Sequence, residues 1–194
     1  MWRFLRDCLS AVTRRALLLV TLNWLFFGSL VAGAFAAEAG FVRFSVWPVG
    51  AEVFSLEVEN AVLLLISIFL FNLILSGFVL LTLTGIGLFV LPFGFLLLRA
   101  FLWGMMIDGL STPIFLAALP TIVLEGEGYV LAALAGIVLG LSWLKPKWVY
   151  PREELSRLEA IRRSLRDCAR TYVWVSVVLL LGATVETLTL ILVF

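Results

Sequence analysis

The stretch that decides the fold is PIFLAALPTIVLEGEGYVLAALAGIVLGLSWL, which runs from Pro113 to Leu144. It is apolar almost throughout, but Glu125 and Glu127 interrupt it near the middle, each followed by a glycine. A charged side chain at bilayer depth is costly and normally turns inward to a partner or to water rather than toward lipid. We therefore expect a membrane-embedded segment with a polar centre, and we expect the function of the protein to depend on it.

The same stretch predicts a helix that is broken near the membrane midplane. About 20 apolar residues are needed to cross a hydrocarbon core of roughly 30 Å, and the limb before Glu125 is too short to do so alone. Irregular backbone at that depth survives only where protein or water satisfies its polar groups. An earlier run, TGIGLFVLPFG at residues 84–94, predicts a tight turn or a second break. The residues expected to interrupt helices are Pro92, Pro120, Gly126 and Gly128.

The composition places the whole chain in the membrane class. Of its 194 residues, 63% are hydrophobic and 14% are charged, and the mean hydropathy is +1.14. An ordinary soluble domain is nearer half apolar and a quarter charged. Further apolar runs cover residues 16–37, 60–83, 93–107 and 173–194. We therefore expect one transmembrane domain, residues 1–194, with an all-α, polytopic integral membrane fold of about five transmembrane helices.

Three polar segments flank these runs. Residues 1–15 interleave apolar and basic side chains at helical spacing, which predicts an N-terminal amphipathic helix on the membrane surface. Residues 38–59 are acidic and are expected to form an outer loop, with a partner-binding loop as the alternative. Residues 145–172 predict a basic cytoplasmic amphipathic helix that lies on an anionic leaflet or docks to a cytoplasmic partner. Acidic residues interrupt its basic face, so we expect no nucleic acid. Its membrane-surface or partner-binding residues are expected to be Arg157, Arg162, Arg163 and Arg166.

The distribution of basic residues predicts the orientation in the membrane. Of the fourteen Lys and Arg residues, four precede the first span and eight lie between Leu144 and the last span. With a cytoplasmic N-terminus and five crossings, all of these lie in the cytoplasm, as the positive-inside rule requires. If the broken segment crossed twice, the two basic regions would lie on opposite faces. We therefore expect a multi-pass protein of the cell membrane, with its C-terminus outside.

Ionisable and amide side chains within the apolar runs form the candidate functional site. Arg99 is the expected counter-ion for the intramembrane acids, but three acids against one arginine leave charge that must be protonated, hydrated or balanced by a ligand. Two interpretations stay open: an ion-pair network that fixes helix packing, and a proton or cation path. The residues of the candidate polar centre are Asn72, Arg99, Glu125, Glu127 and Glu186.

The absence of histidine from the sequence narrows the possible chemistry. It removes Ser–His and Cys–His catalysis and the common His-ligated metal sites. Intramembrane carboxylates can form an aspartic-type site only where two of them converge on one water. Glu125 and Glu127 are two residues apart and diverge on a regular helix, which leaves Glu186 as the one partner for such a site. We expect no catalytic residue, no cofactor and no metal.

The order of these residues resembles the stage II sporulation protein M family. The features that carry the resemblance are, in chain order, Asn72, Gly85, Gly87, Gly104, Pro120 and Glu125, then a small-residue helix, a basic segment and a last span with LLLGATVE ending at Glu186. The family's central signature is similar to Pro-His-Gly-x-x-Glu. Pro120 and Glu125 match it, whereas Thr121 and Ile122 stand in the His and Gly positions. A role that depends on the family's histidine is therefore not expected here.

The resemblance implies a function as well as a fold. In sporulating bacteria it implies a polytopic scaffold that holds peptidoglycan-degrading partners during engulfment. The spans are also similar to the permease halves of some ABC exporters. We expect a non-enzymatic scaffold or membrane-remodelling subunit in the lipid bilayer, as a homo-oligomer or with other membrane proteins. The alternative is a transport protein, namely an ABC-type permease subunit that engages a cytoplasmic ATPase through residues 145–172, or an ion-coupled carrier. An intramembrane protease is the third hypothesis.

Overall fold

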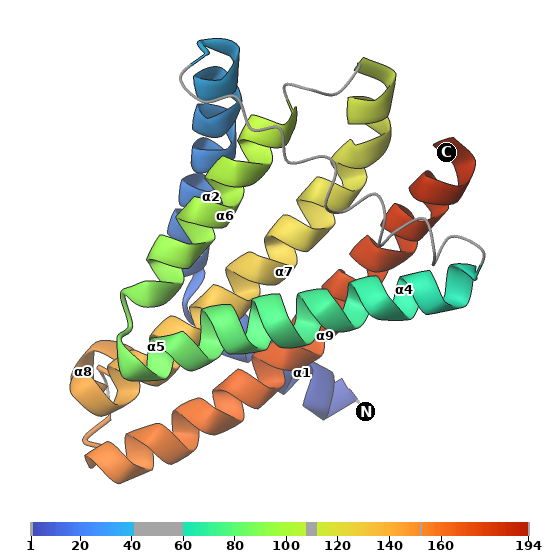
Figure 1. The fold of residues 1–194 in the computed structure, drawn as a ribbon. Helices are drawn as coiled ribbons and strands as arrows, with labels where there is room; N and C mark the ends of the chain where they lie inside the picture. The colour runs from blue at the N-terminus through green and yellow to red at the C-terminus, as the bar shows by residue number, and fades with distance from the viewer. Residues whose placement is uncertain (1, 41–59, 108–111, 152, 194) are drawn as a thin grey trace.

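The computed structural model describes residues 2–40, 60–107, 112–151 and 153–193, and every regular element within these ranges is a helix (Figure 1). The expected all-α fold is thus confirmed for the described part of the chain. The helices are α1 (Trp2–Thr13), α2 (Ala16–Glu38), α4 (Ala61–Leu70), η1 (Phe71–Leu83), α5 (Thr84–Gly87), α6 (Leu91–Ile107), α7 (Thr112–Leu144), α8 (Pro146–Val149) and α9 (Arg157–Val193). Because α4, η1 and α5 follow one another without a gap, they form one long rod.

Four helical stretches are long and apolar enough to cross a membrane: Ala16–Glu38, Ala61–Gly87, Pro113–Leu144 and Arg157–Leu192. They support an integral membrane protein. Helix α6 has 17 residues and measures roughly 26 Å at 1.5 Å per residue, which is less than the usual spanning length. It runs beside α2 (Figure 1). The fifth crossing assigned to this segment therefore stays a prediction.

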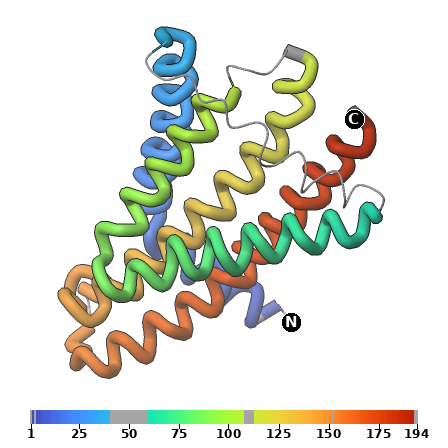
Figure 2. Tube along the Cα trace, in the orientation of Figure 1, coloured from blue at the N-terminus to red at the C-terminus, as the bar shows by residue number. Residues whose placement is uncertain are grey.

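Helix α7 is the centre of the bundle. Figure 2 shows it between the α2–α6 pair on one side and the rod of α4 with α9 on the other. Its residues 128–140 are all buried. Their small side chains allow this enclosure, because a Cβ atom on Gly136 or Gly140 would overlap backbone atoms of η1 or α5. The small residues Ala132, Gly136 and Gly140, spaced four apart in the sequence, thus form the face against which the rod packs.

The predicted break in the middle of this segment is wrong, because α7 is one continuous helix of 33 residues. Gly126 and Gly128 instead allow side chains of neighbouring helices to pack closely against α7. A Cβ atom on Gly126 would lie 2.5 Å from Cε1 of Phe26 in α2, and one on Gly128 would overlap the Leu179 side chain of α9. Pro120 lies inside the helix, where membrane helices tolerate proline because neighbouring groups and local adjustments satisfy the freed carbonyl.

The interruption expected near Pro92 does occur, as a turn between two helices. Helix α5 ends at Gly87 and α6 begins at Leu91. Pro92 is therefore in the first turn of α6, where a backbone N–H has no partner within the helix and its loss costs little. The turn reverses the chain, so that α6 packs along α2 rather than extending the rod.

The basic segment at residues 145–172 was predicted to be one separate amphipathic helix, and this is wrong. It instead includes the short helix α8 and the first half of α9. This helix is continuous over 37 residues, or roughly 55 Å, so it extends well beyond the thickness of a bilayer core. Its start is fixed by a capping box, in which Ser156 and Glu159 hydrogen-bond to each other's backbone N–H. At the other polar segment, α2 extends to Glu38, and the predicted outer loop beyond it, at residues 41–59, lies outside the described residues.

Candidate functional site

Four side chains from three helices form a directed chain of hydrogen bonds inside the bundle. Arg99 of α6 donates from Nη2 to the hydroxyl of Tyr129 in α7 over 2.6 Å. The Tyr129 hydroxyl donates to Oδ1 of Asn72 in η1 over 2.7 Å. Asn72 in turn donates from Nδ2 to Oε1 of Glu125 over 2.5 Å. We call these residues the Arg–Tyr–Asn–Glu chain; it links a cation to a carboxyl group through two neutral groups.

The geometry of η1 explains why its polar side chains face α7. Its buried residues are Asn72, Ser76, Gly77, Leu81 and Thr82, so burial recurs at intervals of four to five residues. An α-helix repeats every 3.6 residues, whereas a π-helix bonds residue i to i+5 and has more residues in each turn. The π-helical winding therefore places these residues on one stripe. Thr82 extends the polar contacts along α7, since its hydroxyl donates to the carbonyl of Ala132 over 3.0 Å.

Arg99 lies at the middle of α6 and makes no direct ion pair with any acid that the structure describes. Its Nη1 donates to Ser76 Oγ over 3.0 Å. Its guanidinium stacks over Tyr129, 4.1 Å from the ring centroid, and over Trp103, 5.0 Å from the centroid. Cation–π contacts of this kind gain strength where the cation is desolvated. The arginine predicted as a counter-ion is therefore joined to Glu125 through Tyr129, either by way of Asn72 or by the longer contact of 3.5 Å from the Tyr129 hydroxyl to Oε2 of Glu125.

A second acid joins Glu125 from α9. Glu186 lies beside Glu125 and within electrostatic range of Arg99. The two helices approach closely there, because a Cβ atom on Gly182 would be 2.9 Å from Cγ of Glu125. Glu125 is 4% exposed, whereas Glu186 is half-buried. The polar centre thus draws side chains from η1, α6, α7 and α9.

Glu127 does not belong to this centre. It is two residues beyond Glu125, so on a continuous helix it points to a different side. There it lies half-buried beside Asn23 of α2. Asn23 donates to the carbonyl of Leu19 over 3.2 Å, and its own side-chain oxygen is buried with no partner among the described residues.

Three residues in or beside the centre were not anticipated from the sequence. Tyr129 carries the central hydroxyl and is fully buried. It is one helical turn after Glu125, and this spacing could have indicated that the two side chains lie on the same face of the helix. Ser76 follows Asn72 by four residues in an apolar run, and this spacing is a weaker indication of a shared face. Trp103 also contributes, because its ring packs edge-on against Tyr129 with the centroids 5.6 Å apart. Aromatic residues are common in membrane helices, so their role is visible only in the packing.

Asp167 is the hub of a separate charged cluster, which we call the Asp167 cluster. Its Oδ2 accepts a hydrogen bond from Arg15 Nη2 over 3.0 Å and one from the Tyr150 hydroxyl over 3.1 Å. Arg170 lies 3.9 Å from Asp167 and 3.5 Å from Asp7 of α1. Burial, reinforced by the Asp167 charge, raises the pKa of Tyr150 to about 12. The cluster ties α1 and the start of α2 to α9.

The arginines predicted to bind a surface or a partner are divided by the structure. Arg157, Arg162 and Arg166 are exposed on α9. Arg163 is instead engaged within the chain, since it forms an ion pair with Glu153 and stacks over Tyr150, 5.0 Å from the ring centroid. The surface of α9 that is free to bind a partner is therefore smaller than the sequence indicated.

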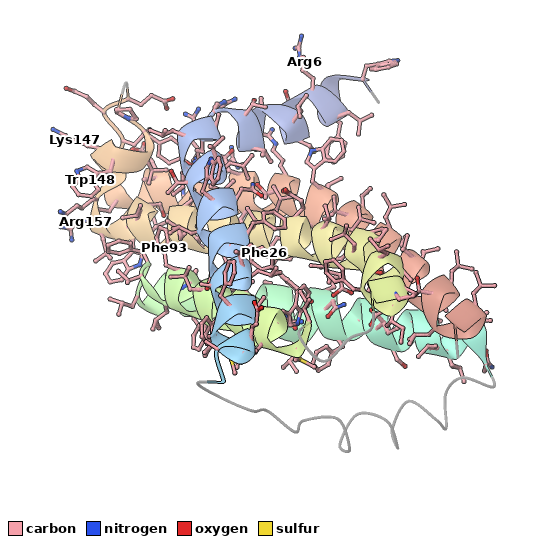
Figure 3. All side chains as sticks on the ribbon, turned by 90° about the horizontal axis from the view of Figure 1, so that it is seen from above. Arg6, Phe26, Phe93, Lys147, Trp148 and Arg157 are labelled. Carbon is pink, nitrogen blue, oxygen red and sulfur yellow. The ribbon has the colours of Figure 1, made fainter. Side chains whose placement is uncertain are left out.

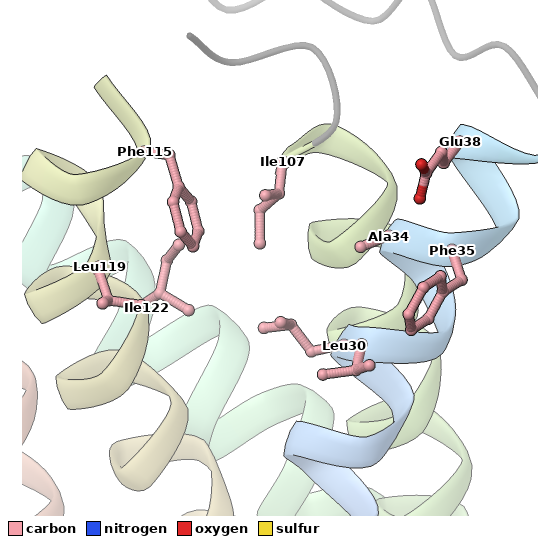
Figure 4. A pocket seen from close by; sticks show the side chains of 9 residues that line it. Leu30, Ala34, Phe35, Glu38, Ile107, Phe115, Leu119 and Ile122 are labelled. Carbon is pink, nitrogen blue, oxygen red and sulfur yellow. The ribbon is translucent and has the colours of Figure 1, made fainter. Parts of the chain in front are cut away.

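An apolar pocket of about 330 Å³ lies between α2, α6 and α7 (Figure 4). Leu30, Phe35 and Ile107 face Phe115 and Leu119 of α7 across it. No residue of the polar centre lines the pocket. Within the described ranges no three Cys, Asp or Glu side chains come together as metal ligands. Comparisons with protein-family models, curated proteins and solved structures give no match for this chain.

Proposed function

We propose that the protein is a non-enzymatic scaffold or remodelling subunit of a membrane complex. The observation that carries the proposal is the Arg–Tyr–Asn–Glu chain, whose links all run between side chains of different turns or helices of this protein. A network of this kind fixes the positions of the helices relative to one another. The pocket described above does not reach it.

The energetics of helix packing in lipid support a structural role for the network. Lipid tails are as apolar as leucine, so helices associate through close packing of small residues and through interhelical hydrogen bonds. Both devices are present here. A Cβ atom on Gly33 or Gly104 would overlap the backbone of the partner helix in the α2–α6 pair, and the chain joins α6 to η1 and α7. A bundle held in this way presents fixed surfaces for partners.

The resemblance to the stage II sporulation protein M family favours the same function, because it implies a scaffold for envelope enzymes. Under this proposal the N-terminus and the first half of α9 are cytoplasmic, and the C-terminus is outside. The exposed arginines Arg157, Arg162 and Arg166 would then face the inner leaflet or a cytoplasmic protein. The protein would act as an oligomer or together with other membrane proteins.

The Glu125→Gln variant tests the proposal. A glutamine keeps the shape of the side chain and the acceptor for Asn72, but it cannot carry charge. If the protein is a scaffold, the variant should retain its partners and its oligomeric state, measured by purification in mild detergent followed by mass spectrometry and cross-linking. Glu127→Gln, outside the centre, is the matched control. Loss of all partners in Glu125→Gln, with the fold intact by circular dichroism, would contradict a purely structural centre.

A transport protein is the second candidate, and one observation favours it. Glu125 and Glu186 lie side by side within the bundle with no direct ion pair to Arg99, and Glu186 is half-buried rather than enclosed. Neighbouring intramembrane acids often mark proton or cation paths. In that case Glu125→Gln should abolish ion flux in proteoliposomes, or the protein should co-purify with an ATPase bound at the basic half of α9.

A further inference from the structure

A groove of about 500 Å³ lies between α1 and α9, away from the polar centre. Trp2, Leu5, Arg6 and Leu9 of α1 line one side, and Trp174 of α9 lines the other. The volume falls within the range of ordinary small-molecule sites, about 300–1,000 Å³. The groove is thus large enough for part of a lipid, and most of its lining is apolar.

The orientation of α1 is fixed by its other face. Cys8, Ala11 and Val12 are buried, and the ion pair between Asp7 and Arg170 holds α1 against α9. This docking leaves the apolar stripe of the groove uncovered. Trp2 is 83% exposed and Leu9 is 53% exposed, although they lie one above the other on the helix. A contiguous exposed apolar surface of this kind indicates a site that binds a protein, a ligand or a membrane.

The position of the groove points to the bilayer as that partner. Helix α1 ends at Thr13, and the spanning helix α2 begins at Ala16, so α1 lies at the membrane boundary. Tryptophans are enriched at this level, where one side of the ring is apolar and the other is wet. Trp2 and Trp174 occupy the two sides of the groove. Lipid acyl chains are the apolar groups that this surface meets.

One exposed arginine gives the groove a preference for negative charge. Arg6 forms no hydrogen bond or ion pair with any other described residue, and Figure 3 shows it at the outer edge of α1, pointing away from the bundle. An oxygen-rich anion beside an apolar chain would complement this arginine. Phospholipid headgroups carry such oxygens, and those of the inner leaflet include anionic ones.

We propose that the groove between α1 and α9 binds one anionic phospholipid, with an acyl chain against Trp2, Leu5 and Leu9 and the phosphate at Arg6. The site depends on the docking of α1 and not on the polar centre, so it is independent of the scaffold and transport proposals. The bound lipid would hold α1 at the membrane surface and thereby connect the Asp167 cluster to the leaflet.

The test is native mass spectrometry of the full chain in detergent, with phosphatidylglycerol and phosphatidylcholine of identical acyl chains added in turn. One phosphatidylglycerol should be retained per chain in preference to phosphatidylcholine. Arg6→Gln should weaken phosphatidylglycerol binding about tenfold, since a charge-assisted hydrogen bond is lost.

Two further variants distinguish binding in the groove from general attraction to basic residues. Arg6→Lys should restore most of the preference, because it restores the charge. Arg14→Gln removes an exposed arginine just after α1 that does not line the groove, and it should leave binding unchanged. Equal retention of the two lipids, or equal loss in Arg6→Gln and Arg14→Gln, would overturn the proposal, because attraction to the overall basic surface would then account for binding.

Discussion

Removing a single oxygen atom from the polar centre tests whether it holds the bundle together. Tyr129→Phe keeps the ring, and so keeps its contact with Trp103 at 5.6 Å and the stacked Arg99 guanidinium at 4.1 Å. It removes the hydroxyl that accepts from Arg99 over 2.6 Å and donates to Asn72 over 2.7 Å. Both partners are then left without this bond in a buried site.

The expected cost follows from the two bonds. A buried hydrogen bond to a charged group contributes about 1.5 kcal/mol or more, and a neutral one about 1 kcal/mol. Interhelical hydrogen bonds measured in lipid contribute about 0.6 kcal/mol on average and at most about 1.7 kcal/mol. We therefore take about 1.5 kcal/mol for the bond to the charged Arg99 and about 1 kcal/mol for the neutral bond to Asn72. The sum is a loss of about 2.5 kcal/mol, or roughly 70-fold in the unfolding equilibrium.

The assay is reversible unfolding in mixed micelles by titration with a denaturing detergent, followed by circular dichroism. The matched control is Tyr172→Phe, because the Tyr172 hydroxyl shares one neutral bond of 2.7 Å with Thr82; it should lose only about 1 kcal/mol. In a double-mutant cycle, Asn72→Leu should cost less in the Tyr129→Phe background than alone. If Tyr129→Phe costs no more than Tyr172→Phe, the chain does not hold the helices together.

The same unfolding measurement checks two other contacts. Gly104→Ala should cost about 1–3 kcal/mol, because its Cβ atom would overlap the backbone of α2 and a backbone cannot rotate away. Gly94→Ala in the same helix meets nothing within 4 Å and should be neutral or slightly stabilising, so equal effects of the two would refute the close α2–α6 packing. Asp167→Asn should cost about 3 kcal/mol, since it leaves Arg15, whose side chain is only 12% exposed, without its counter-charge. Glu153→Gln breaks an exposed ion pair and should cost less than about 1 kcal/mol; a similar loss in both would show that burial of the Asp167 cluster has no energetic consequence.

The membrane class and the all-helical fold were predictable because they depend on composition and on runs of apolar residues. Both quantities can be read directly from the amino-acid sequence. The polar residues Asn72, Arg99, Glu125 and Glu186 were recognisable for the same reason, since an ionisable or amide side chain in an apolar run is costly unless it is partnered. Which of them meet could not be read from the order. Arg99 contacts Ser76 and Tyr129 rather than a carboxylate, because helix packing sets the distances.

The glycines show where local interpretation fails. Gly126 and Gly128 were predicted to interrupt a helix, yet α7 is continuous and both positions admit side chains of neighbouring helices. A glycine lowers helix propensity by only about 1 kcal/mol, and close packing on several sides outweighs that cost. Similarly, the predicted boundary before the last span is absent, because nothing in the basic half of α9 prevents a helix from continuing.

The sequence by itself therefore predicted an integral membrane protein, an all-α fold that the described residues confirm, a group of polar residues in the apolar segments and basic residues concentrated in two regions. These conclusions need only hydropathy, charge and the cost of burying ions. The tertiary structure alone decided that α7 is unbroken, that Glu127 lies apart from Glu125 and Glu186, and that a tyrosine hydroxyl joins the cation to the acid. Hydrogen bonds act over about 3 Å, so such partnerships are set by how the helices pack and not by their spacing along the chain.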